Sequence, residues 1–212
     1  CMGVRAAEFS KYAANAFLAT KISFINEMAG ICARLGVDIE EVRRGIGSDR
    51  RIGTHFIYAG CGYGGSCFPK DVKALIRTAE HEGIEPGILR AVEARNALQK
   101  TLLFQALREH FNGHLQGRVV ALWGLAFKPG TDDLREAPSL VLLDALLTAG
   151  AEVQACDPAA TAAVATRYAA AVEAGQLMLS ESPYAVAQGA DALVLVTEWK
   201  QFRQPDFPRI RG

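Results

Sequence analysis

The spacing of hydrophobic residues changes halfway along the chain, from the period of helices to short apolar runs separated by helices. The segment from about Val4 to Leu35 has no proline and leaves one broad apolar face, which predicts a single long helix closed by Gly36. Because the apolar face is wide, this helix needs other helices on more than one side. The first 112 residues are therefore expected to form a helical domain. Its further helices are predicted over residues 37–46, 68–81 and 87–108.

Short apolar strands begin after Gly117 and alternate with helices toward the end of the chain. Strand, helix and strand in that order predict right-handed parallel units, and hence an α/β fold with a doubly wound parallel sheet over residues 113–212. Ligands of such sheets sit beyond the carboxyl ends of the strands, where residues 124–128 lie. That loop has no GxGxxG fingerprint, so a purely structural loop is an equal reading. The predicted strands are 118–123, 151–156, 177–179 and 192–196, and the predicted helices are 138–148, 160–174 and a short one from Pro183.

Composition narrows the classes of function. Half of the residues are hydrophobic, and 23 Lys and Arg balance 23 Asp and Glu, which argues against nucleic acid as a partner. No apolar run is expected to reach the length of a membrane span, and the N-terminus lacks the pattern of a signal peptide. Five widely spread cysteines indicate a reducing cytoplasm. Cys61 and Cys67 lack the spacing of a zinc site, so no metal is expected.

A glycine-rich bend followed by a cysteine is the clearest chemical signal. Four glycines within residues 60–65 precede Cys67, and Pro69 marks the first turn of the helix predicted from residue 68. Cys67 is thus expected at a helix N-terminus, where free N–H groups favour the thiolate, and Lys70 adds a second positive charge. The sequence therefore predicts a nucleophilic cysteine. The alternative is a surface turn followed by a small buried cysteine.

Four separated motifs occur in one order along the chain. They are Lys11-Tyr-Ala-Ala-Asn15, Arg51-Ile-Gly53, residues 60–71, and residues 124–138, which read Gly-Leu-Ala-Phe-Lys-Pro-Gly-Thr-Asp-Asp-Leu-Arg-Glu-Ala-Pro. With them the chain resembles the UDP-glucose/GDP-mannose dehydrogenase family over nearly all its length. The resemblance implies a central dimerisation domain followed by a Rossmann-like domain that binds the nucleotide sugar, incomplete at its C-terminus. It also implies that the family's N-terminal NAD-binding domain and its C-terminal Gly-Arg-Asn motif are absent, so the chain alone is expected to be inactive.

The activity that the resemblance implies is oxidation of UDP-glucose at C6 to UDP-glucuronate with two NAD+. A Cys67 thiolate would capture the intermediate aldehyde as a thiohemiacetal, and water would hydrolyse the thioester formed next. Lys11 and Asn15, four residues apart on one helix face, would stabilise the oxyanion at C6. Asp71 would position or deprotonate water. A GDP-mannose dehydrogenase is the nearest alternative, and an inactive dimerisation and nucleotide-binding module is the alternative for this chain by itself.

The resemblance also assigns binding contacts and a homodimer built through the long apolar helix. Arg51 would reach the substrate of a neighbouring subunit, while Lys70 and Arg135 would touch NAD, since an arginine suits a pyrophosphate. The structural alternatives are ordinary surface ion pairs for Arg51 and Arg135 and a place in the hydrophobic core for Phe127. The residues expected to contact the UDP-sugar are Lys11, Asn15, Arg51, Phe56, Ile57, Tyr58, Ala59, Gly60, Tyr63, Gly64, Phe127 and Lys128.

Overall fold

A computed structural model describes residues 2–211, and the contacts within it divide the chain into two units, residues 1–99 and 100–212. The predicted boundary after residue 112 is therefore too late. Leu107 and Leu115 are buried in the core of the second unit, and Phe104 packs against the same core. The segment between residues 100 and 115 belongs with the sheet because its apolar side chains are buried there.

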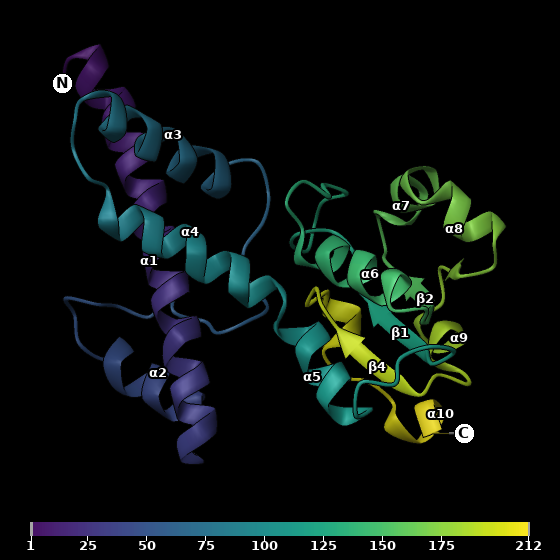
Figure 1. Cartoon of the computed structure of the whole chain (residues 1–212). Coiled ribbons are helices and arrows are strands. Elements are labelled where there is room, and N and C mark those ends of the chain that lie inside the picture. The colour runs from purple at the N-terminus through teal and green to yellow at the C-terminus, as the bar shows by residue number, and fades with distance from the viewer. Residues whose placement is uncertain (1, 212) are drawn as a thin grey trace. The chain divides into compact units, whose positions relative to one another are not determined.

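The first unit is a helical bundle, as predicted (Figure 1). α1 lies along α3, and its small residues Ala16 and Ala19 are buried beside Val72 of α3 and Val92 of α4. Small side chains let helices approach closely, so α1 can bury part of its length in this way. The helices are α1 (Val4–Leu35), α2 (Ile39–Gly47), α3 (Phe68–His81) and α4 (Gly87–Lys100).

α1 is long and apolar enough to cross a membrane by length and composition alone, with a mean hydropathy of 1.2 over its best 18-residue window. The expectation that no apolar run reaches the length of a membrane span is therefore wrong. Two polar side chains of α1 are nevertheless buried within the unit, where Ser23 bonds the Val92 carbonyl and Asn26 bonds the Gly60 amide. Core helices pass the same test of length and composition, so α1 by itself is weak support for a membrane span.

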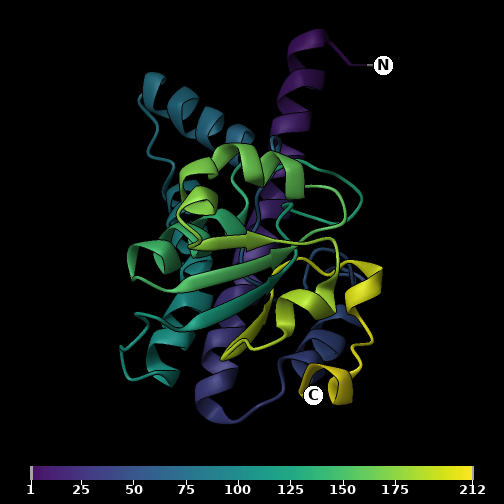
Figure 2. The ribbon, with the colours of Figure 1, turned by 90° about the vertical axis from the view of Figure 1, so that its right-hand side faces the viewer.

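The second unit is built on a parallel sheet with strand order β3-β2-β1-β4, which confirms the predicted doubly wound α/β fold (Figure 2). Val120 of β1 aligns with Val153 of β2 on one side and with Ala192 of β4 on the other. The elements are α5 (Leu102–His110), β1 (Val119–Trp123), α6 (Pro138–Thr148), β2 (Glu152–Cys156), α7 (Thr161–Arg167), α8 (Ala169–Glu173), β3 (Leu177–Leu179), α9 (Pro183–Ala187), β4 (Ala192–Leu195), the 3-10 helix η1 (Lys200–Phe202) and α10 (Phe207–Arg211).

Each face of this sheet carries a hydrophobic core. Val120 and Leu122 face the larger core, which includes α6, whereas Trp123 packs with Val186 of α9 and stacks on Phe202. Side chains of successive strand residues point to opposite faces, so one strand supplies both cores. Because β1, β2 and β4 are parallel, their carboxyl ends lie at the same end of the sheet.

Two helices predicted as continuous are broken in the structure. The segment 87–108 divides at Thr101 into α4 and α5, and the segment 160–174 divides at Tyr168 into α7 and α8. Tyr168 leaves the helical conformation, with φ −113° and ψ 31°, and its hydroxyl donates to Asp144 Oδ1 of α6 at 2.6 Å. Both predictions of a continuous helix were wrong, because helical spacing along a sequence does not reveal a residue at which the helical hydrogen bonding stops.

Candidate functional site

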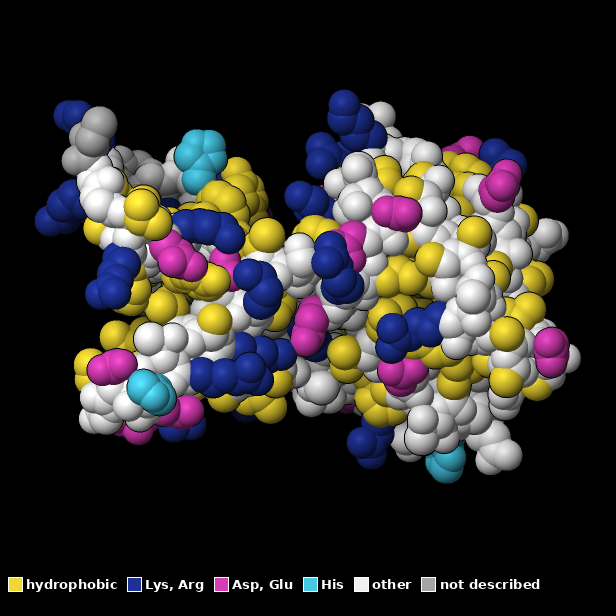
Figure 3. Space-filling view, turned by 90° about the horizontal axis from the view of Figure 1, so that it is seen from above, with side chains coloured by type: hydrophobic (Ala, Val, Ile, Leu, Met, Phe, Trp, Pro, Cys, Tyr) yellow, Lys and Arg dark blue, Asp and Glu magenta, His cyan; other side chains and the backbone are white. Residues whose placement is uncertain are grey.

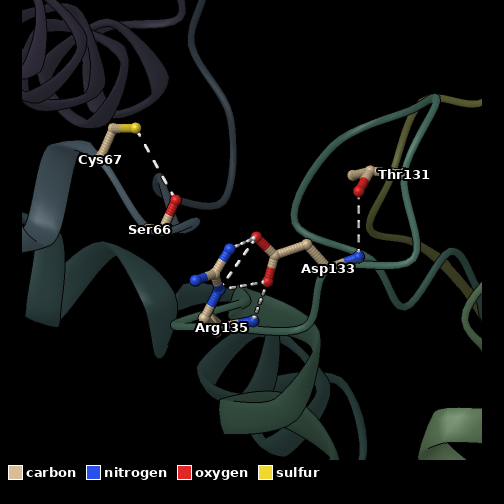
Figure 4. Close-up of polar contacts among 5 residues, drawn as sticks. All are labelled: Ser66, Cys67, Thr131, Asp133 and Arg135. Carbon is tan, nitrogen blue, oxygen red and sulfur yellow. Dashed lines mark hydrogen bonds and ion pairs between the residues drawn. The ribbon is translucent and has the colours of Figure 1, made fainter.

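Cys67 stands at the start of α3 with its side chain exposed to solvent. Gly62 and Gly65 adopt φ values of 104° and 84°, a conformation that glycine reaches without strain, so the bend needs glycine at these positions. The Asp71 amide donates to the Cys67 carbonyl at 2.9 Å and closes the first turn of the helix. The Ser66 hydroxyl lies 3.7 Å from Cys67 Sγ (Figure 4). The prediction of a helix beginning directly after this cysteine is confirmed, and the alternative of a buried cysteine is excluded.

The Asp71 carboxylate is the centre of a charged cluster one helical turn after Cys67. Its side chain is fully buried, and it accepts a hydrogen bond from Asn15 Nδ2 at 2.6 Å. Lys70 Nζ lies 2.8 Å from Oδ1, and Lys11 Nζ lies 4.0 Å from Oδ2. The structure therefore brings Lys11, Asn15 and Asp71 together as predicted. Lys11 and Asn15 meet at the Asp71 carboxylate, and their role toward an oxyanion at C6 stays a prediction.

Opposing influences set the pKa of Asp71. Burial alone would raise it, but hydrogen bonds from Lys70 and Asn15, together with the charges of Lys70 and Lys11, outweigh burial and hold the pKa of Asp71 below its ordinary value of 3.8. The same pairing raises the pKa of Lys70, chiefly through its hydrogen bond with Asp71 and with a smaller contribution from Cys67. At neutral pH this pairing holds an ionised Asp71 carboxylate beside the Lys70 ammonium.

Acid should remove the stabilisation that Asp71 supplies. Because the pKa of Asp71 is lower in the folded chain, its contribution to stability is full above the unfolded value near 3.8 and is lost as pH falls through the folded pKa. Asp71→Asn should cost about 1 to 3 kcal/mol of unfolding free energy at pH 7, and this difference should shrink in strongly acidic buffer. Urea unfolding at a series of pH values measures it. A difference that stays constant with pH would mean that charge is not what the carboxylate contributes.

Three amide side chains form hydrogen bonds with the backbone of the glycine bend, and none of them was predicted from the sequence. Asn26 Oδ1 accepts from the Gly60 amide at 2.8 Å, and Gln99 donates to the Gly60 carbonyl. Asn96 accepts from the Tyr63 amide at 2.9 Å and donates to the Tyr63 carbonyl at 3.0 Å. Amides within otherwise apolar helix faces were the signal that could have revealed them, because a buried amide needs partners.

The other predicted substrate contacts of the first unit divide into buried and exposed groups. Ile57 and Tyr63 are buried, and Gly64 is buried beside them, so these residues support the bend. Phe56 has φ 62°, which is uncommon outside glycine, and its ring lies 6.0 Å from that of Phe68. The exposed residues are Arg51, Phe56, Tyr58 and Gly60, and Ala59 is half-buried.

Arg51 is held on its own loop. Its guanidinium donates to both carboxylate oxygens of Asp49, at 3.0 Å from Nε to Oδ1 and 2.6 Å from Nη2 to Oδ2. This is the surface ion pair named as the structural alternative for Arg51. Its side chain is 89% exposed, so the ion pair leaves much of the guanidinium open to solvent. A role toward a second subunit stays a prediction.

In the second unit the predicted contacts follow the end of β1. Phe127 is half-buried and packs against the core, its amide donates to the Asp133 carbonyl at 3.0 Å, and Lys128 Nζ lies 5.3 Å from its ring centroid. Asp133 holds Arg135 by a two-pronged ion pair, with Nη2 to Oδ2 at 2.7 Å, and its own amide donates to Thr131 (Figure 4). Arg135 lowers the pKa of Asp133, mainly through this side-chain hydrogen bond. The loop thus exposes two cations, Lys128 and Arg135.

The loop that joins β1 to this segment is tied to a residue that was not among the predicted site residues. Asp157 follows β2 and is 2% exposed, and its carboxylate accepts from the amides of Leu125 and Ala126. The Asp-Pro pair after a predicted strand was the available signal, because acidic residues at strand ends often hold loops or ligands. Across residues 2–211, no three His, Cys, Asp or Glu side chains come together in a group able to hold a metal ion.

Comparison with known sequences supports two assignments along the chain. Residues 5–98 match the central domain of the UDP-glucose/GDP-mannose dehydrogenase family, and residues 121–212 match the UDP binding domain of the same family. A UDP-glucose 6-dehydrogenase of Pseudomonas aeruginosa is 75% identical over 211 residues, covering 100% of this chain and 47% of the relative. A UDP-glucose 6-dehydrogenase of Haloferax volcanii is 45% identical over 204 residues, covering 96% and 46%. The chain spans about half the length of the curated relatives it matches.

Solved structures agree with the fold. A UDP-glucose dehydrogenase from Pyrobaculum islandicum superposes with a TM-score of 0.88 at 42% identity, covering 97% of this chain and 46% of that one. A GDP-mannose dehydrogenase from Pseudomonas aeruginosa superposes with a TM-score of 0.62 at 31% identity, covering 96% and 48%.

Proposed function

Because the chain belongs to the UDP-glucose/GDP-mannose dehydrogenase family, we propose that it forms the central and UDP-binding parts of an NAD-dependent enzyme that oxidises UDP-glucose to UDP-glucuronate. The observation that carries this proposal is an exposed Cys67 at a helix start, one turn before a buried carboxylate that binds Lys11 and Asn15. A thiol beside charged groups of this kind suits covalent capture of an aldehyde. The curated relatives named above are UDP-glucose 6-dehydrogenases, which favours a glucose substrate.

The Cys67 thiolate attacks the C6 aldehyde of the half-oxidised sugar. A C–S bond forms, the C=O π bond opens, and the resulting oxyanion takes a proton to give a thiohemiacetal. The ammonium of Lys11, 61% exposed, and the amide of Asn15 are the groups that stabilise this oxyanion, and Asp71 orients both of them. The chemistry that bound NAD+ would supply is acceptance of the hydride from C6 in each of the two oxidations.

Release of the product needs water. Water adds to the thioester carbonyl, the C–S bond breaks, and the Cys67 thiolate leaves as the carboxylic acid forms. Asp71 is ionised at neutral pH, because its pKa lies below the ordinary value, and a low pKa makes a carboxylate a weak base, so the part we assign to Asp71 is to orient Lys11 and Asn15 around this water. The proton that water gives up passes to the leaving thiolate or to solvent. Its pairing with Lys70 and Asn15 keeps the carboxylate in the form that this step requires.

Lys70 and Arg135, the residues assigned to NAD, can contribute positive charge toward its phosphates. Lys70 and Arg135 are exposed cations, the charge that a pyrophosphate needs, and each already pairs with a neighbouring carboxylate. Lys70 and Arg135 are thus the groups of this chain proposed to hold the cofactor, with the cofactor fold itself supplied outside these two units.

The substrate's nucleotide is assigned to the second unit, and dimerisation to the first. Phe127 and Lys128 at the end of β1 are proposed to contact the UDP moiety. α1 exposes Phe17, Phe24 and Ile31 at seven-residue intervals, a spacing that places them along one side of a helix. We assign this stripe to a homodimer in which Arg51 reaches the substrate of the second copy. Figure 3 shows hydrophobic side chains among charged ones on one face of the molecule.

UDP-glucose should stabilise the chain more than GDP-mannose does. A ligand at one hundred times its dissociation constant adds about 2.7 kcal/mol to the stability of the folded state, which raises the melting temperature by several degrees. We expect such a rise with UDP-glucose and a smaller one with GDP-mannose, measured by differential scanning fluorimetry. A larger rise with GDP-mannose would favour the mannose enzyme, to which the structural likeness is lower.

The chain on its own should not turn over substrate. Incubation with NAD+ and UDP-glucose is expected to give no increase in NADH absorbance, because the two units match the central and UDP-binding domains of the family and the chain spans about half the length of its curated relatives. Sustained NADH production would contradict this expectation. If no NADH forms, the isolated chain is an inactive binding module, and the dehydrogenase activity belongs to the enzyme of which the chain forms part.

A further inference from the structure

The buried carboxylate of Asp157 accepts hydrogen bonds from three separate segments of the chain. Oδ2 accepts from the amides of Leu125 at 2.6 Å and Ala126 at 3.0 Å, both in the loop after β1. Oδ1 accepts from the amides of Ala159 and Ala160, each at 2.8 Å, in the turn that starts α7. Trp199 Nε1, after β4, adds a bond to Oδ2 at 3.1 Å. One side chain therefore joins the carboxyl ends of three neighbouring strands.

The loop held by Asp157 is also fixed through its carbonyl groups. Ser139 Oγ of α6 donates to the Leu125 carbonyl, and Thr197 Oγ1 donates to the Ala126 carbonyl at 2.6 Å. The Gly124 amide donates to the Cys156 carbonyl at 2.8 Å. These backbone groups of residues 124–126 are thus hydrogen-bonded within the unit. The bonds fix the direction in which the chain continues to Phe127.

This arrangement changes how the sheet can bind a nucleotide. In doubly wound folds the amides of the first strand–helix loop and of a helix start usually hold a phosphate at this place. Here the Asp157 carboxylate takes those amides, so an internal anion stands where a ligand's pyrophosphate would sit. A second anion is disfavoured beside it by charge and by the lack of donors. The nucleotide must therefore be contacted by the segment that follows, from Phe127 onward.

We propose that Asp157 is a positioning residue for nucleotide-sugar binding, which acts by fixing residues 124–126 so that Phe127 and Lys128 are presented to the UDP moiety. The proposal rests on the function assigned above and adds a residue that touches no substrate. Its consequence is that the second unit binds UDP through the loop beyond the strand end and not through the amides of the strand-end turn.

UDP affinity of the chain, measured by isothermal titration calorimetry, tests this role. Asp157→Asn should weaken UDP binding at least tenfold at a temperature where the variant is folded by circular dichroism, because an amide has a single acceptor oxygen and cannot accept from the Leu125 and Ala126 amides and from the Ala159 and Ala160 amides at once. Asp157→Ser is a second variant, whose hydroxyl can still cap the turn before α7 but is too short to hold the loop. It should weaken UDP binding to a similar degree.

Asp191→Asn is the matched control. Asp191 lies beside the opposite end of β1 and also bonds a backbone amide and a side chain, with Val119 N at 2.8 Å and Arg118 Nη1 at 3.0 Å. Its loss should lower stability and leave UDP affinity within about twofold, since its bonds lie far along β1 from the loop. Equal weakening by the Asp191 and Asp157 variants, or unchanged affinity in folded Asp157→Asn, would overturn the proposal. If neither Asp157 variant folded, the carboxylate would be holding the whole unit, which would also overturn it.

Amide hydrogen exchange separates this proposal from the function on which it rests. In the ligand-free Asp157→Asn chain the Leu125 and Ala126 amides should exchange faster than in the wild type, while those of Asp191→Asn at the same positions should not change. If the wild type failed to bind UDP, the proposed function would be at fault. If exchange at Leu125 and Ala126 were unaltered in Asp157→Asn, the positioning role would be at fault.

Discussion

Replacing Gly124 with alanine should lower the free energy of unfolding by about 2 to 5 kcal/mol. Gly124 has φ 94°, and a Cβ added there would lie 2.6 Å from the Thr197 amide nitrogen and 2.8 Å from Thr197 Cα, with Thr197 Cβ closer still. The first two are backbone atoms of a residue that follows β4, so they cannot rotate away as a flexible side chain would. Urea unfolding followed by circular dichroism measures the loss, which is a large part of the stability of a typical domain.

Gly117 offers the control for this substitution. It lies before β1, also has a positive φ of 72°, and a Cβ added to it would meet no atom within 4 Å. Gly117→Ala therefore carries only the conformational cost, about 1 to 2 kcal/mol. The difference between the two variants isolates the close approach of Gly124 to Thr197. Equal losses for both would show that contact with Thr197 is not what requires glycine at position 124.

Mixing the chain with a UDP-sugar that carries a carbon-13 aldehyde at C6 should give a thiohemiacetal resonance, and Cys67→Ala should abolish it. This step needs no cofactor, because the thiol adds to an aldehyde already formed. Cys67 is exposed at the start of α3, so the sulfur is accessible to a bound sugar. Carbon-13 NMR distinguishes the adduct from free and hydrated aldehyde. The expected effect is complete loss of the adduct signal.

Cys61→Ala is the matched variant, since Cys61 belongs to the same bend and is only half-buried. It should retain the adduct, because it lies before the glycines that turn the chain into α3. An adduct that survives in Cys67→Ala and disappears in Cys61→Ala would show that Cys61 is the nucleophile. An adduct absent from the wild type despite measured UDP binding would contradict covalent capture itself.

The candidate nucleophile could be predicted from sequence because its geometry is local. Glycines at 62 and 65, Pro69 in the first turn and Asp71 two residues later define a bend and a helix start within ten residues. The meeting of Asn15 with Asp71 joins residues 56 positions apart, and spacing alone could place Asn15 only on a helix face. The amides of Asn26, Asn96 and Gln99 were missed for the same reason, since their partners are backbone groups of a distant bend.

The order and type of most elements, the parallel sheet, and the position of the cysteine before α3 could all be deduced from the amino-acid order. These features depend on periodicity, on glycine and proline, and on contacts between near neighbours. Three others became visible only in the folded chain: where the chain divides into two units, that α4 and α5 are separate helices, and which groups the Asp157 carboxylate binds. Each of these depends on which distant groups share a buried space. Leu107 joins the sheet core, and a buried carboxylate must take its donors from whichever strand ends converge on it.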